Sequence, residues 1–165
     1  MPETHTSAIL NVLYILLSNE TDSEILLLTV KAFGDYIPHS KIFFHNQEQK
    51  NILLSLIYGL CNHSSEMIRF QSVQILLDVV RTYYDVLESN IDDLLKISMQ
   101  KLEDEESIAI LTYEIWCSIC DTEIARSIKN SHLPNREYSN KVYPMLLKAI
   151  LNHIVQISTD QDKWS

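Results

Sequence analysis

Glycine is nearly absent from this chain, and its scarcity constrains the fold more than any other feature. Only 2 of the 165 residues are glycine. Antiparallel β folds depend on tight turns, and many tight turns require glycine. Loops that bind phosphate also need several glycines, because the backbone must approach the anion closely. The composition therefore predicts an all-α protein and disfavours a nucleotide-binding loop.

Almost every segment carries apolar residues at helical spacing, which predicts about seven helices. Short polar turns such as "NETD" and "EDEE" join these helices into antiparallel pairs. Corresponding helices recur at roughly 40 to 43 residues, a period typical of HEAT and armadillo repeats. The pattern favours an α-solenoid of HEAT repeats. A compact bundle of the same helices is the alternative that periodicity alone leaves open.

The same period predicts the organisation of the chain as one domain over residues 1–165. We expect repeats at about 8–38, 45–85 and 88–130, and the first helix of a further repeat at about 138–158. The segment "IPHSKIFFHN", which contains Pro38, is interpreted as a link between pairs. The segment "NSHLPNREYS", which contains Pro134, is interpreted as a surface loop.

The charge of the chain bears on its partners. The formal net charge is -9. Nucleic acid and anionic lipid both attract basic surfaces, so neither is an expected partner. A basic peptide or protein is the natural complement, although the charge could serve only solubility.

The expected compartment follows from the apolar runs and the cysteines. No signal-peptide pattern is present, and the apolar runs are shorter than the roughly 20 residues of a membrane span. The 3 cysteines are an odd number without framework spacing. We therefore expect a soluble intracellular protein with reduced thiols.

A Cys-x-x-Cys motif lies within "YEIWCSICDTE", Tyr113–Glu123. A redox pair needs its first thiol at a helix N-terminus, usually after a strand. Here the helix is expected to start near Glu105 or Glu106, so Cys117 and Cys120 would lie about three turns inside it. We expect both to be small packed residues beside Trp116, and a thiol oxidoreductase is the alternative. Zinc needs roughly four ligands, so two cysteines do not predict a metal site. No cofactor or catalytic site is predicted either.

Two acidic residues share a face of the same helix. Glu114, Cys117 and Asp121 follow one another at i, i+3 and i+7. Paired carboxylates could act as general acid and base, but nothing else in the sequence suggests a catalytic cleft. The remaining interpretations are a solvated helix face and a binding surface for basic side chains.

Two segments resemble the importin-β (karyopherin-β) family of nuclear transport receptors. They are "RFQSVQILLDVVRTYYDVLES" (Arg69–Ser89), with its paired tyrosines, and "EIWCSICDTE" (Glu114–Glu123), with its Trp–Cys–Asp order. The resemblance extends over residues 8–164. It implies that the chain is a fragment with the fifth to seventh HEAT repeats and the first helix of the eighth.

The resemblance also implies partners and a location. Receptors of this family shuttle between cytoplasm and nucleus through pores in the nuclear envelope. They bind the Phe-Gly repeats of nucleoporins and a basic importin-α segment or basic cargo, and the full-length proteins bind Ran-GTP. Another HEAT scaffold, such as a different karyopherin or a phosphatase or chromatin scaffold, is the alternative.

Site residues are carried over from the family by position. The nucleoporin-binding groove would comprise Leu10, Asn11, Tyr14, Gln49, Ile52 and Leu53. The importin-α segment would meet Glu114 and Asp121. This chain has Ile52 where the family has Phe, and Tyr14 where the family has an aliphatic residue, so the aromatic bulk is expected on the opposite side of the groove. Ordinary packing between repeats is the alternative for these residues.

Overall fold

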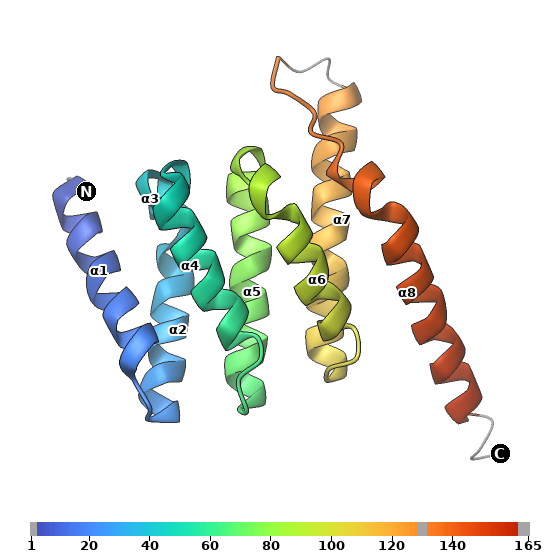
Figure 1. Cartoon of the computed structure of the whole chain (residues 1–165), viewed down its shortest axis with the longest axis horizontal. Coiled ribbons are helices and arrows are strands. Elements are labelled where there is room, and N and C mark those ends of the chain that lie inside the picture. The colour runs from blue at the N-terminus through green and yellow to red at the C-terminus, as the bar shows by residue number, and fades with distance from the viewer. Residues whose placement is uncertain (1–2, 129–131, 162–165) are drawn as a thin grey trace. The chain divides into compact units, whose positions relative to one another are not determined.

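The computed structural model is predominantly helical over the residues that it describes, 3–128 and 132–161 (Figure 1). No strand occurs in these ranges, which confirms the predicted all-α class. The α-helices are α1 (Glu3–Asn19), α2 (Ser23–Tyr36), α3 (Lys41–His45), α4 (Gln47–Leu60), α5 (Glu66–Tyr83), α6 (Ile91–Lys101), α7 (Glu106–Ile128) and α8 (Tyr138–Gln161). Among the described helices, none combines the length and the hydropathy that a membrane crossing demands. The chain divides into two compact units, residues 1–87 and 88–165.

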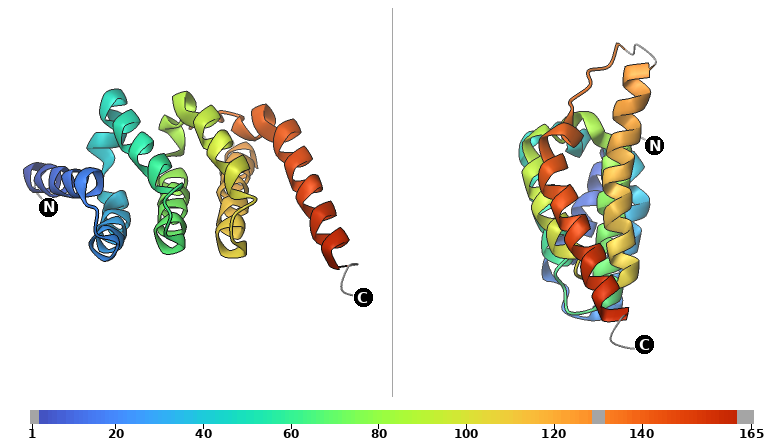
Figure 2. Two further views of the ribbon diagram at one scale, coloured as in Figure 1. Left: turned by 60° about the horizontal axis from the view of Figure 1, so that its bottom comes forward. Right: turned by 90° about the vertical axis from the view of Figure 1, so that its right-hand side faces the viewer.

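The first unit has two layers of helices. Helix α2 packs against α1 and α5, and α4 packs against α5 and α1. Helices α1 and α4 thus form one layer and α2 and α5 the other (Figure 2). The core between them contains Val30, Phe33, Ile57 and Leu76, each at most 1% exposed. Burial of apolar side chains such as these is the main favourable contribution to folding, at about 25 cal/mol for each Å² of apolar surface removed from water.

The link expected at residues 37–46 is mostly helical. It forms a 3-10 turn, Ile37–His39, followed by α3. The hydroxyl of Tyr83 donates a hydrogen bond of 2.6 Å to the carbonyl oxygen of Ile37. The ring of Phe44 stacks on Tyr83 with 4.3 Å between the ring centroids. The segment folds because Ile37, Phe43 and Phe44 are apolar and all three become buried.

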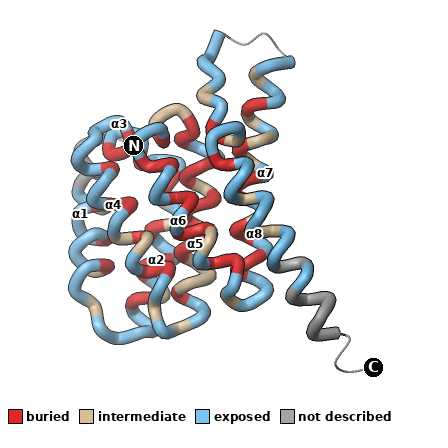
Figure 3. The backbone as a smooth tube through the Cα atoms, turned by 45° about the vertical axis from the view of Figure 1, so that its right-hand side comes forward, coloured by how far each residue is buried: buried red, intermediate tan, exposed pale blue. Residues whose placement is uncertain are grey.

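The second unit is built from α6, α7 and α8. Helix α6 contacts both α7 and α8, and α7 also contacts α8. Ile108, Ile115 and Ile119 of α7 are at most 1% exposed and form the centre of this core. Figure 3 shows the buried positions along the helices in red. At the turn into α7, Lys101 and Asp104 form an ion pair of 2.8 Å in which both side chains are 9% exposed.

The connection between α7 and α8 is held by side-chain hydrogen bonds. The described part of the expected surface loop, residues 132–137, contains no helix, and residues 129–131 lie outside the described ranges. Arg126 donates to the carbonyl of Pro134 at 2.6 Å. The amide of Asn135 donates to the carbonyl of Glu123 at 3.2 Å. These bonds fasten the loop to the last turns of α7.

Glu123 holds the N-terminus of α8. Its carboxylate is buried, and it accepts hydrogen bonds from the backbone amides of Tyr138 at 2.6 Å and Ser139 at 3.3 Å. The Ser139 hydroxyl donates to the same carboxylate. A negative charge at this end of a helix also interacts favourably with the helix dipole. Just before α8, Glu137 turns the chain with a φ of 54°.

The Tyr83 contact yields a prediction about stability. Tyr83→Phe keeps the stack on Phe44 but leaves the buried carbonyl of Ile37 without this donor. The backbone amide of Ser40 still donates to that carbonyl at 3.0 Å, so we expect the free energy of unfolding to fall by about 0.5–1.5 kcal/mol, the net contribution of one hydrogen bond. Urea denaturation measures it, with Tyr143→Phe as the control because Tyr143 is 60% exposed. Equal stability of the two variants would contradict the anchoring role.

The Glu123 contacts yield a second prediction. Glu123→Ala removes the acceptor from the first backbone amides of α8, and we expect a loss of about 1–3 kcal/mol. Hydrogen exchange at the amides of Tyr138 and Ser139 should accelerate. Asp121→Ala, an exposed acid on the same helix, serves as the control and should change stability by less than about 0.5 kcal/mol. Unchanged exchange at those amides in Glu123→Ala would show that other contacts fix α8.

Candidate protein-binding sites

The first candidate site is a pocket between α1 and α4 in the first unit. Its volume is about 160 Å³. The helical spacing places each helix's contributions on one face, at i, i+1 and i+4 on α1 and at i, i+3 and i+4 on α4. The residues that line it are Leu10, Asn11, Tyr14, Phe43, Gln49, Ile52 and Leu53. The structure thus brings together all six residues that the resemblance implied, and it adds Phe43.

Burial divides the pocket into a floor and a rim. Leu10, Phe43 and Leu53 are 1%, 7% and 3% exposed and form the apolar floor. Tyr14 and Ile52 are 37% and 44% exposed and form the rim. An exposed apolar rim above an apolar floor suits one aromatic or aliphatic side chain, which would displace water from both.

Two amide side chains give the pocket its polar edges. Asn11 and Gln49 are both exposed, one on each helix. Primary amides can donate and accept, so they suit the main chain of a peptide on either side of an inserted ring. The start of α4 is held by Asn46, whose side chain accepts a 3.0 Å hydrogen bond from the backbone amide of Gln49.

Phe43 is the pocket residue that sequence reasoning missed. Its segment was expected to be a link, so no side chain there was assigned to a floor. The signal was present in the apolar "IFF" triplet, which a solvated link would not need. Helix α3, which contains Phe43, contacts α4 directly.

The second candidate site is the exposed face of α7 in the second unit. Glu114 and Asp121 are both exposed, and they lie two turns apart, about 10 Å along the helix axis. Exposed apolar residues continue the same face at helical spacing, namely Ile110, Ile124 and Ile128. The arrangement can pair two basic groups and cover the apolar side chains that flank the two acids.

The prediction that both cysteines of the motif are packed was wrong for Cys117. Cys117 is exposed and Cys120 is half-buried, whereas Cys61 is buried. Helix α7 is apolar on most sides, so periodicity did not identify its buried face. Trp116 is only 4% exposed, and the next residue lies about 100° further round the helix, towards solvent.

The helix position of the motif agrees with expectation, since α7 begins at Glu106. Burial, followed by the negative charges of Glu123, Cys117 and Asp121, raises the pKa of the Cys120 thiol. A redox nucleophile needs the opposite shift. Within residues 3–128 and 132–161, no three His, Cys, Asp or Glu side chains are grouped so that they could hold a metal ion.

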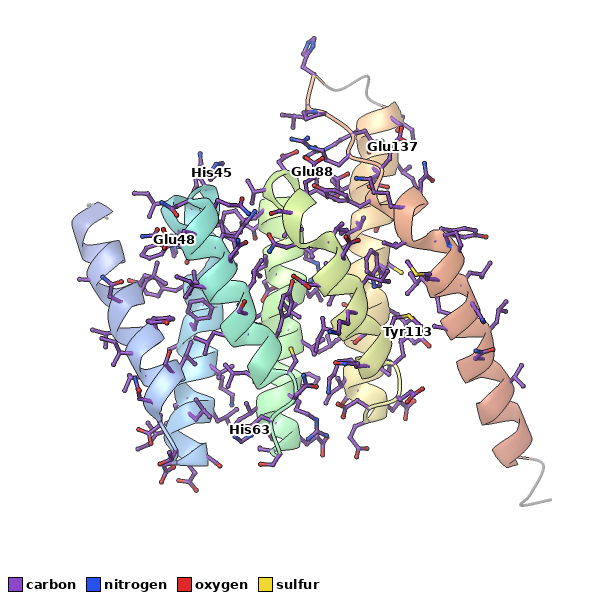
Figure 4. The ribbon with its side chains drawn as sticks, in the orientation of Figure 1. His45, Glu48, His63, Glu88, Tyr113 and Glu137 are labelled. Atoms are coloured by element: carbon purple, nitrogen blue, oxygen red, sulfur yellow. The ribbon has the colours of Figure 1, made fainter. Side chains whose placement is uncertain are left out.

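Figure 4 shows the side chains as sticks on the ribbon. The labelled Glu88 and Glu137 lie at the end of the second unit where the loop enters α8. Arg136 of that loop forms an ion pair of 3.0 Å with Glu88. Such a partly exposed pair is typically worth at most about 1 kcal/mol. The stronger fixation of this end of α8 therefore comes from Glu123.

No family model matches the sequence. The chain is 23% identical over 151 residues to importin subunit beta-1 of Arabidopsis thaliana, which covers 87% of this chain and 17% of that protein. A solved structure, the crystal structure of importin beta in an ammonium sulfate condition, matches with a TM-score of 0.72 and 20% identity. That match covers 82% of this chain and 16% of the other.

Both comparisons confirm the resemblance to importin-β that the sequence indicated. They also confirm the fold class, an α-solenoid of HEAT repeats. The chain spans less than a fifth of the length of each of these relatives, as the 17% and 16% coverages state.

Proposed function

We propose that this chain is a segment of a karyopherin-type nuclear transport scaffold and binds its partners without performing catalysis. The observation that carries the proposal is the pocket between α1 and α4. Residues chosen from the family resemblance alone converge on one apolar pocket of about 160 Å³. Its proposed ligand is the Phe side chain of a nucleoporin Phe-Gly repeat.

The geometry of the pocket supports a Phe side chain. The ring would rest on Leu10, Phe43 and Leu53 and pass between Tyr14 and Ile52. Tyr14 supplies an aromatic face for an edge-to-face or offset contact, which adds roughly 0.5–1.5 kcal/mol beyond area burial. Glycine beside the Phe would let the peptide main chain approach the amides of Asn11 and Gln49. Binding is expected to be weak, since a disordered peptide loses entropy when it orders.

The proposed partner of the α7 face is a basic segment, either that of importin-α or one in a basic cargo. Glu114 and Asp121 would pair with Lys or Arg, and Arg can pair bidentately with a carboxylate. The formal net charge of -9 would accelerate the approach of such a segment. The same charge argues against nucleic acid and anionic membranes as partners.

The remaining parts of the proposal concern a full-length receptor. Such a receptor would bind Ran-GTP and shuttle between cytoplasm and nucleus through the nuclear envelope. We expect the chain by itself to bind Phe-Gly peptides weakly and Ran-GTP hardly at all.

The pocket assignment is tested by substitution of its rim. Ile52→Ser removes apolar surface that would contact the ring, and we expect roughly five- to tenfold weaker binding of a Phe-Gly peptide. NMR titration gives the affinity and should show shifts at Tyr14 and Ile52 in the wild-type chain. Ile42→Ser is a matched control, because Ile42 is 48% exposed but does not line the pocket.

Three results would count against this pocket. The first is a titration without shifts at the rim, and the second is an equal loss of affinity in both Ile variants. The third is equal affinity for a peptide in which Ala replaces Phe, since the floor would then not be used.

The α7 face is tested by neutralisation of its acids. Glu114→Gln combined with Asp121→Asn removes both charges while preserving side-chain size. Exposed ion pairs are worth about 0.2–1 kcal/mol each, so the loss of two predicts roughly twofold to thirtyfold weaker affinity for an Arg-rich peptide. The salt dependence of binding should also become shallower. Asp92→Asn with Asp93→Asn on α6, two exposed acids outside this face, controls for net charge. Equal losses in the two double variants would assign binding to overall charge and not to α7.

A further inference from the structure

The thiols of Cys117 and Cys120 are not used by either proposed binding site, although α7 places them close together. Their positions differ by three residues, so their Cα atoms lie about 4.5 Å apart along the axis and roughly 5 Å apart in space. Cysteines joined by a disulfide have Cα separations of about 4.4–6.8 Å, and an atom inserted between the sulfurs spans at least that separation. The helix therefore holds the two sulfurs within reach of one bridging atom.

Access and proximity are both visible in the structure. Cys117 is exposed and Cys120 is half-buried, so a small reagent can approach the pair from solvent. The charge of Cys117 is one of the causes that raise the pKa of Cys120, which requires the two thiols to be near one another. Cys61 is buried and belongs to the other unit, so it does not contribute to this pair.

The surroundings of the pair decide which ligand it can hold. A metal ion bound by two cysteines needs both sulfurs deprotonated. Burial and the negative charges of Glu123 and Asp121 oppose a thiolate at Cys120. The described residues supply no third ligand to compensate. A ligand that leaves the sulfurs neutral and covalently bound avoids this electrostatic cost.

We propose that Cys117 and Cys120 form a dithiol site for trivalent arsenicals that carry one organic group. The reactive species is an organoarsenous acid, which has two hydroxyl groups on arsenic. Each thiol forms an As–S bond and gives its proton to the hydroxyl group that leaves. Two As–O bonds break, two As–S bonds form and two waters depart, and arsenic stays trivalent. The product is uncharged, and its two sulfurs belong to adjacent turns of α7.

Phenylarsine oxide, which hydrates to the organoarsenous acid, is the probe for the test. We expect one adduct per folded chain by native mass spectrometry, with loss of both solvent-reactive thiols in a thiol count. The adduct should persist in excess glutathione, because a monothiol lacks the chelate advantage, and a 1,2-dithiol should remove it. Failure to form an adduct, or its removal by glutathione, would overturn the proposal.

Single variants separate chelation from simple attachment. Cys117→Ser and Cys120→Ser each leave one sulfur, and we expect each to weaken binding roughly a hundredfold. Cys61→Ala should bind as tightly as the wild-type chain. Circular dichroism checks folding, and a stoichiometric adduct on the wild-type chain after trypsin digestion identifies the bridged peptide if a variant fails to fold. A bridge to Cys61, or full affinity in either Ser variant, would refute the site. The readout does not depend on peptide binding, so this experiment tests the arsenical site independently of the proposed function.

Discussion

The contact of Tyr83 with residues 37–44 is the interaction on which the first unit depends. A stacked ring and a buried hydrogen bond hold the end of α5 against the segment between α2 and α4. The segment is not a solvated link, because its three apolar side chains are buried against the rest of the unit. Helix α3 lies within this segment, and it carries Phe43 to the floor of the pocket. The candidate binding site is therefore a consequence of how this connection is anchored.

Glu123 is the corresponding anchor in the second unit, where it holds the start of α8. A buried carboxylate is costly unless its oxygens accept enough hydrogen bonds, and here the first amides of α8 and a serine hydroxyl provide them. The first backbone amides of α8 have no acceptor within the helix, and their hydrogen bonds to Glu123 offset the cost of burying its carboxylate. On α7, Glu123 is therefore buried and has a structural role, whereas Glu114 and Asp121 are exposed to solvent. The sequence motif does not distinguish these roles, because all three residues are carboxylates.

The sequence predicted more of the fold than of the sites. All-α architecture followed from helical periodicity and from the scarcity of glycine, since both act locally along the chain. The placement of the cysteines about three turns inside α7 also followed, because it needed only the start of the helix. The exposure of Cys117 did not follow, because a helix that is apolar on most sides has no single face marked for burial. The contacts of α6 and α8 selected the side that contains Ile108, Ile115 and Ile119.

By itself, the sequence determined that the chain forms helices and which residues share a face of each helix. Leu10 and Tyr14 lie on one face of α1, and Gln49 and Leu53 lie on one face of α4, because 3.6 residues complete each turn. The family resemblance implied that these two faces meet, and only the tertiary structure showed that Phe43 closes the floor between them. Burial depends on neighbours that are distant in sequence, and local periodicity contains no information about which neighbours those are.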